Sequence, residues 1–172
     1  MSLVIPQNIH ADHPPPATII RAIEPRDDDA MARRLSERVS DSLGSDPDSK
    51  LSLSDIYAAP RCAYFVMERD GLIVGGAGIA PLTCDFAHIA ELQCFVLLPM
   101  SGKRGHARRL LDHCLDAADA MGFRTCYAES RSIEAEMNDL LRIAGFQHLG
   151  KPLRDPTNAS CDTYHFLTLG DR

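Results

Sequence analysis

The pattern of apolar and polar residues predicts an alternating series of strands and helices. β-branched and apolar runs predict strands over residues 17–23, 62–68, 72–80, 88–98, 123–130, 146–149 and 161–169. Apolar residues at helical spacing follow the aspartates 27–29 and predict a helix that ends at Gly44, and a short second helix falls within 45–60. Two longer helices are predicted, one from the turn 102–105 to Gly122 and one from a Ser132 cap to Gly145, with Ile133 on its buried face.

Two connections predict how the strands pair. Asp70-Gly71 joins the strands 62–68 and 72–80, and this dipeptide is typical of an antiparallel hairpin. The strands 88–98 and 123–130 are separated by a long helix, so their connection is a crossover and the two strands should be parallel. The chain is therefore predicted to form a mixed sheet of the α/β class.

Composition narrows the possible functions. Residues 1–16 are polar and end in three prolines, which predicts a flexible arm before a single domain over 17–172. The net charge of −6 argues against general nucleic-acid binding, and we expect neither a signal peptide nor a membrane segment. The six cysteines are widely spaced, so we interpret them as reduced, mostly buried thiols of a cytoplasmic protein, with no metal site.

A basic, glycine-containing turn follows the strand 88–98. Gly102 and Gly105 allow a ligand to approach the backbone closely, and the amides that open the following helix point outward. Four cations accompany them, namely Lys103, Arg104, Arg108 and Arg109. This combination fits a pyrophosphate, and the alternative is a solvated helix start. The other glycine group, Gly75, Gly76 and Gly78, lacks a dinucleotide pattern and instead indicates a bulge or a close approach of another segment.

The segment Gly102-Lys-Arg-Gly-His-Ala107, preceded by Phe95-Val-Leu-Leu-Pro99, resembles the acetyl-CoA motif of the GNAT superfamily of N-acetyltransferases. Gly102 stands where the family usually has Gln or Arg. Four more segments resemble this family in the same order: 70–82, Glu91-Leu92, 140–146 and 161–164. The resemblance covers roughly Thr18 to Leu169.

This resemblance implies a fold and a coenzyme site. The fold is α/β (α+β by some schemes), with a mixed, mostly antiparallel central sheet, flanking helices and a parallel strand pair that splays apart. The pantetheine arm of acetyl-CoA would pair with the strand around Phe95, Val96 and Leu97. The pyrophosphate would lie on the helix-opening turn, whose residues are Gly102, Lys103, Arg104, Gly105, His106, Ala107 and Arg108.

The resemblance further implies direct transfer of acetyl to a primary amine of a small molecule or a peptide. Such an amine needs a base, for which Glu91 is the first candidate and Glu129 the second, although either could be a solvated or ion-paired carboxylate. The family's usual acid, a tyrosine, is replaced here by Leu141. Tyr127, His148 and Tyr164 are possible substitutes, and Tyr127 joins the two glutamates as a catalytic candidate.

Three alternatives stay open at this point. The chain could be a different acyltransferase, such as one that uses a longer acyl chain. The chain could be a non-catalytic acyl-CoA-binding or regulatory domain, as the leucine at 141 and the glycine at 102 suggest. Cys94 and Cys126 could act as nucleophiles, but no His-Asp pair is arranged for them, so buried, inert thiols are favoured. A homodimer is common for this fold and is expected by analogy.

Overall fold

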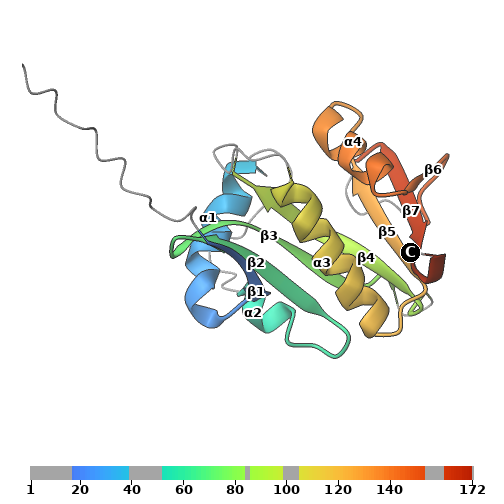
Figure 1. Cartoon of the computed structure of the whole chain (residues 1–172). Coiled ribbons are helices and arrows are strands. Elements are labelled where there is room, and N and C mark those ends of the chain that lie inside the picture. Colours follow the sequence, from blue (N-terminus) through green and yellow to red (C-terminus); the bar gives the residue numbers. More distant parts are fainter. Residues whose placement is uncertain (1–16, 39–51, 84–85, 99–104, 154–160, 172) are drawn as a thin grey trace, which may run out of the picture.

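The computed structural model describes residues 17–38, 52–83, 86–98, 105–153 and 161–171. Its centre is a seven-stranded sheet with the strand order β1-β2-β3-β4-β5-β7-β6 (Figure 1). The strands are β1 (Thr18–Ala22), β2 (Ala63–Arg69), β3 (Leu72–Pro81), β4 (Ile89–Leu97), β5 (Thr125–Ser130), β6 (Gln147–Leu149) and β7 (Thr163–Thr168). β4 and β5 are parallel and all other neighbours are antiparallel. The predicted mixed, mostly antiparallel sheet with one parallel pair is confirmed.

Helices cover both faces of this sheet. They are α1 (Asp28–Arg38), α2 (Leu53–Ile56), α3 (His106–Ala120) and α4 (Ala135–Ile143), with short 3-10 turns at Pro25–Asp27 and Leu169–Asp171. One apolar cluster joins α1 and α2 to β2 and β4, and a larger one joins α3 and α4 to the opposite face. A third, smaller cluster lies between β4, β5 and β7 on the α1/α2 face and includes Tyr127. Within the described ranges, no helix has the length and apolar character that crossing a bilayer requires.

The long helix α3 shows why the sequence pattern was informative. Its apolar stripe is buried against the sheet, at positions Leu110, Leu111, Cys114, Leu115 and Ala118. The helix ends where predicted, because Gly122 adopts a left-handed φ of +81° and its N–H donates to the Asp119 carbonyl at 2.8 Å.

The start of α4 differs from the prediction. The helix begins at Ala135, and its N-cap residue is Glu134, two residues after the expected Ser132 cap. The Ser132 N–H and hydroxyl both donate to Asp162, the hydroxyl at 2.7 Å, so this residue is held against the segment that precedes β7. Ile133 is correspondingly 79% exposed and does not face the core as expected. The expected end of the first helix at Gly44 and the expected arm 1–16 lie outside the described residues.

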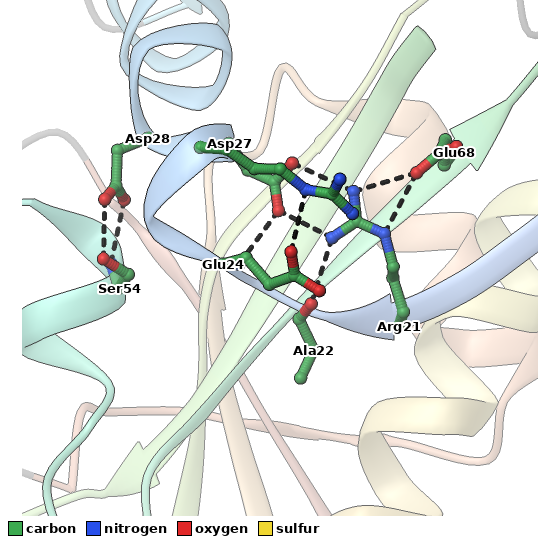
Figure 2. A network of polar contacts seen from close by, with 8 residues as sticks. Arg21, Ala22, Glu24, Asp27, Asp28, Ser54 and Glu68 are labelled. Atoms are coloured by element: carbon green, nitrogen blue, oxygen red, sulfur yellow. Dashed lines mark hydrogen bonds and ion pairs between the residues drawn. The ribbon is translucent and has the colours of Figure 1, made fainter. Parts of the chain in front are cut away.

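A polar network anchors α1 to the sheet, and Figure 2 shows its members. The guanidinium of Arg21, on β1, donates to both carboxylate oxygens of Asp27 at 2.6 and 2.9 Å. It also donates to Glu68 of β2 at 2.8 and 3.0 Å. Asp27 is buried, and the Arg21 guanidinium holds its pKa below the usual range. The network therefore satisfies a buried carboxylate just before α1 begins.

A second contact in Figure 2 joins α1 to α2. The Asp28 carboxylate accepts the Ser54 N–H at 2.9 Å and the Ser54 hydroxyl at 2.6 Å. Because Tyr57 directly follows α2, this link also positions the Tyr57 ring, which packs against Tyr64 of β2 with 5.1 Å between the ring centroids.

Candidate active site

The central strand β4 is interrupted by a bulge. Gly76 pairs with Val96 and Gly78 with Gln93, so one β3 residue, Ala77, stands opposite two residues of β4. Cys94, in the bulge, has a left-handed φ of +50°, which costs a non-glycine residue about 1–2 kcal/mol. The Tyr64 hydroxyl donates to the Cys94 carbonyl at 3.0 Å and helps to hold this conformation.

The bulge lies where β4 and β5 stop pairing. The parallel ladder has four residue pairs, from Ile89–Thr125 to Leu92–Ala128, although β4 continues to Leu97. A bulge bends its strand and increases the local twist, which carries β4 away from β5. The ladder ends one residue before Gln93, so the local distortion explains why the two strands separate there.

The three predicted catalytic residues lie on one face of the sheet at this point. Glu91 of β4 is in register with Tyr127 of β5, and Glu129 follows two residues later on the same face of β5. Glu91 is 4% exposed, Tyr127 is fully buried and Glu129 is half-buried. The Tyr127 hydroxyl donates to the Glu129 carboxylate at 3.0 Å. Tyr127 is thus an interior residue that orients a neighbouring carboxylate.

Sequence reasoning missed two polar residues beside Glu91. The Tyr57 hydroxyl donates to the Gln93 side-chain carbonyl at 2.8 Å, and the Gln93 amide donates to the Glu91 carboxylate. Burial raises the pKa of Tyr57, so its hydroxyl keeps its proton. The alternation of β4 could have placed Gln93 on the face of Glu91, but no sequence signal places Tyr57 there.

The glycines of β3 make room for these tyrosines. A Cβ built on Gly78 would lie 2.5 Å from Cζ of Tyr57, and one on Gly76 would lie 2.6 Å from Cε1 of Tyr64. Both distances are far below van der Waals contact. The predicted close approach at Gly75, Gly76 and Gly78 is confirmed, and the bulge opposite Gly76 and Gly78 has its extra residue on β4.

The predicted coenzyme residues fall into two groups in the structure. Phe95, Val96 and Leu97 form the end of β4, beyond its pairing with β5. Gly105 is the N-cap residue of α3 with a φ of +120°, and a Cβ there would meet nothing within 4 Å. Gly102, Lys103 and Arg104 lie outside the described residues.

Residues of the first turn of α3 contact β1 and α4. His106 is buried, with Nε2 3.5 Å from the Thr18 hydroxyl, and Ala107 is half-buried. Arg108 donates to Asp112 at 2.8 Å and to the Ile143 carbonyl at the end of α4 at 3.2 Å. The Arg108 side chain therefore joins α3 to α4.

The structure also shows the surroundings of the residues considered as the general acid that protonates the leaving thiolate. Leu141, at the family's usual tyrosine position, is fully buried in the core. The Tyr164 hydroxyl donates to the Cys161 carbonyl at 3.0 Å. The His148 ring lies edge-on to His165 with 5.9 Å between the centroids. None of these contacts distinguishes one of the substitutes as the acid.

The two strand cysteines differ in burial. Cys126 is fully buried, as predicted for an inert thiol. Cys94 is exposed, and its predicted burial is wrong. The reason is the bulge, because the left-handed residue leaves the alternation that would have turned its side chain into a packed layer.

Comparison with known proteins identifies the class to which this fold and site belong. The model of the acetyltransferase (GNAT) family matches residues 30–146. The chain is 32% identical over 156 residues to YjgM of Escherichia coli K12, described as an uncharacterized N-acetyltransferase; the match covers 86% of this chain and 93% of that protein. The chain is a member of the GNAT family of acetyltransferases.

Solved structures share the fold at low sequence identity. A GNAT-family acetyltransferase from Staphylococcus aureus Mu50 has a TM-score of 0.74 at 14% identity, covering 89% of this chain and 99% of that one. The structure of yncA from Salmonella typhimurium, determined with its cofactor acetyl-CoA, has a TM-score of 0.72 at 20% identity, covering 89% and 94%. A ribosomal-protein-alanine N-acetyltransferase from Brucella melitensis has a TM-score of 0.69 at 20% identity, covering 87% and 99%.

Proposed function

We propose that this protein transfers acetyl from acetyl-CoA to a primary amine of a small molecule or a peptide by direct attack. The observation that carries the proposal is the position of Glu91, at the point where β4 and β5 stop pairing and on the same face as Glu129. Family membership supports acetyl transfer, and this geometry supports a base at the reacting end of the coenzyme.

The described residues fit the coenzyme. Beyond Leu92, the β4 edge that faces away from β3 is not covered by β5, so an extended amide-containing arm can lie along Phe95, Val96 and Leu97. The N-terminus of the 15-residue helix α3 has the outward amides and positive dipole end that favour a pyrophosphate. The open backbone at Gly105 allows that group to approach. The acetyl-CoA held by yncA supports the same choice of cosubstrate.

The acceptor amine requires a base. With an ordinary pKa near 10.4, roughly one alkylamine in 2,500 is neutral at pH 7, and only the neutral form is a nucleophile. Glu91 accepts the ammonium proton, directly or through one water. The residue is 4% exposed, so only a small part of it is open to the acceptor. Glu129, half-buried and oriented by Tyr127, adds negative charge that favours a cationic acceptor.

The transfer then balances without any other reactant. The amine nitrogen forms a bond to the acetyl carbon while the carbon–sulfur bond of the thioester breaks. The ammonium loses two protons in all. Glu91 takes the first and later returns it to solvent, and the second, lost from the nitrogen after attack, goes to the leaving thiolate, so the products are an amide and a free thiol. Acetyl-CoA supplies the activated acetyl group in this reaction.

The base assignment is tested with Glu91→Gln. We expect kcat/KM at pH 7 to fall about 100-fold, as general-base loss does, while the calorimetric affinity for CoA stays within twofold. The matched control is Glu136→Gln, at an exposed glutamate of α4, which should leave turnover unchanged. Normal turnover by Glu91→Gln would remove Glu91 from this role.

The coenzyme site is tested separately by binding. Gly105→Pro and Lys103→Glu should each weaken CoA binding at least tenfold, because one distorts the helix-opening backbone and the other reverses a charge at a phosphate. If calorimetry gave the native affinity for both variants, the placement of the pyrophosphate would be wrong.

The second candidate function is a non-catalytic acyl-CoA-binding or regulatory domain. The fully buried Leu141 favours it, because a core leucine cannot supply the acid found at that position in many relatives. A thiol-release assay with acetyl-CoA and a panel of polyamines, amino acids and peptides separates the two. Tight CoA binding without turnover on any acceptor would favour the second candidate.

A further inference from the structure

The Glu91 carboxylate is held by a chain of two hydrogen bonds that starts on a different element. Tyr57, just after α2, donates to Gln93 at 2.8 Å, and Gln93 donates to Glu91. A carboxylate only accepts hydrogen bonds, so the amide must present its NH₂ group to Glu91 and its carbonyl to Tyr57. The Glu91 carboxylate therefore fixes which end of the amide faces it, and the Tyr57 hydroxyl holds the amide in that orientation by donating to its oxygen.

We propose that Gln93 and Tyr57 are positioning residues that keep Glu91 ionised and oriented as the base. This inference rests on the proposed function and extends it by assigning two residues that act through Glu91. A hydrogen bond to the charged form of a carboxylate favours that form. At pH 7 the ionised form is the one able to accept a proton from the incoming amine.

The surroundings of Glu91 make such a donor useful. Within the described residues, the titratable groups that face this region include Tyr57 just after α2, Tyr64 of β2, Cys94 on β4, and Tyr127 and Glu129 from β5. Tyr57 stays protonated because burial raises its pKa, and Glu129 is a like charge. Burial and a like charge both disfavour an ionised carboxylate, and the Gln93 amide opposes them.

The absence of a side chain at Gly78 leaves room for the Tyr57 ring. The Tyr57 ring lies where a side chain on Gly78 would be, and a methyl group there would overlap the Tyr57 hydroxyl. The Asp28–Ser54 contact holds α2, and with it Tyr57, against the sheet. Contacts from β3, α1 and α2 therefore all help to fix Tyr57, and through it the orientation of the Gln93 amide.

The test compares pH profiles of kcat/KM. Gln93→Met keeps the length of the side chain and removes the donor, and Tyr57→Phe removes only the hydroxyl. We expect the acidic limb to move to higher pH by about one unit in Gln93→Met, in the same direction but less in Tyr57→Phe, with KM for acetyl-CoA within twofold. At pH 9 both variants should recover most of the native rate, which a structural defect would not allow.

Two further measurements guard against misfolding. Gly78→Ala displaces the Tyr57 ring and should reproduce the Tyr57→Phe shift, whereas Gly150→Ala, with nothing within 4 Å of the added methyl, should match the native profile. The Gln93 side-chain amide resonances, followed by NMR, should titrate with pH in the native protein and stop doing so in Glu91→Gln.

The outcomes separate this inference from the proposed function. One outcome is that Glu91→Gln is inactive while the acidic limb of the pH profile stays in place in Gln93→Met and Tyr57→Phe. In that case the positioning role of Gln93 and Tyr57 is wrong and the assignment of Glu91 as the base stands. Rate losses in Gln93→Met and Tyr57→Phe that are equal at every pH would also overturn the positioning role of these residues. If the native protein turns over no acceptor, the proposed function fails, while the NMR titration still reports whether Gln93 senses Glu91.

Discussion

At the scale of single residues, Asp27 illustrates how a buried charge is tolerated. Its side chain is 5% exposed and accepts two hydrogen bonds from Arg21 and one from the Glu24 N–H at 2.9 Å. These contacts, the Arg21 hydrogen bonds first, outweigh the effect of burial and hold the pKa of Asp27 below its usual value. The ion pair is therefore part of what joins β1 to the start of α1.

This depressed pKa predicts a pH dependence of stability. The folded pKa of Asp27 lies below the unfolded value near 3.9, so the contribution is fully present above about pH 4 and is lost as the pH falls through the folded pKa. Asp27→Asn should lower the free energy of unfolding at pH 7 by about 2 kcal/mol and flatten the acid loss below pH 4. Urea denaturation at pH 7 and pH 3 measures both effects.

The control for this prediction is Asp139→Asn. Asp139 pairs with Arg142 on the surface of α4, where both side chains are more than half exposed. Such pairs contribute little, so the change should stay within about 0.5 kcal/mol. Equal losses at the two sites would contradict the importance of burial at Asp27.

At the scale of elements, the end of α3 and the bulge of β4 both depend on left-handed backbone. At Gly122 the sequence supplies a glycine, and the Phe123 N–H closes the helix by donating to the Ala118 carbonyl at 3.1 Å. At Cys94 the sequence supplies a cysteine, and the Tyr64 hydroxyl helps to hold the conformation. The first element could be predicted for this reason, and the second could not.

Gly122→Ala tests the helix ending without steric interference. A methyl group there meets nothing within 4 Å, so the expected loss comes from the φ of +81° alone. We expect the free energy of unfolding to fall by about 1–2 kcal/mol. Gly150→Ala, measured in the same denaturation experiment, should change it by less than 0.5 kcal/mol, and a similar loss in both would argue against the conformational explanation.

At the scale of the whole molecule, binding of the coenzyme should stabilise the folded state. It would contact both the end of β4, beyond the four residue pairs that β4 makes with β5, and the start of α3. A ligand that binds only the folded state at 100 times its Kd adds about 2.7 kcal/mol of stability. For a domain of this size that corresponds to a rise in Tm of roughly 5–10 °C.

Differential scanning fluorimetry with acetyl-CoA measures this rise. Adenosine diphosphate alone, which lacks the pantetheine arm, should give a smaller shift because it cannot reach β4. An unchanged Tm at saturating acetyl-CoA would contradict both the coenzyme site and the proposed function.

The sequence by itself determined the order of the elements, the hairpin at Asp70-Gly71, the parallel pair and the class of fold, because these follow from periodicity, turn chemistry and short connections. It also brought Glu91 forward as a candidate, through a resemblance that named one position on one strand. Only the tertiary structure decided the bulge at Cys94, the contact of Tyr57 with Gln93 36 residues away, and the Ser132–Asp162 hydrogen bond just before α4. These features depend on side chains that are distant in sequence and meet only when the sheet has formed, so no local pattern encodes them.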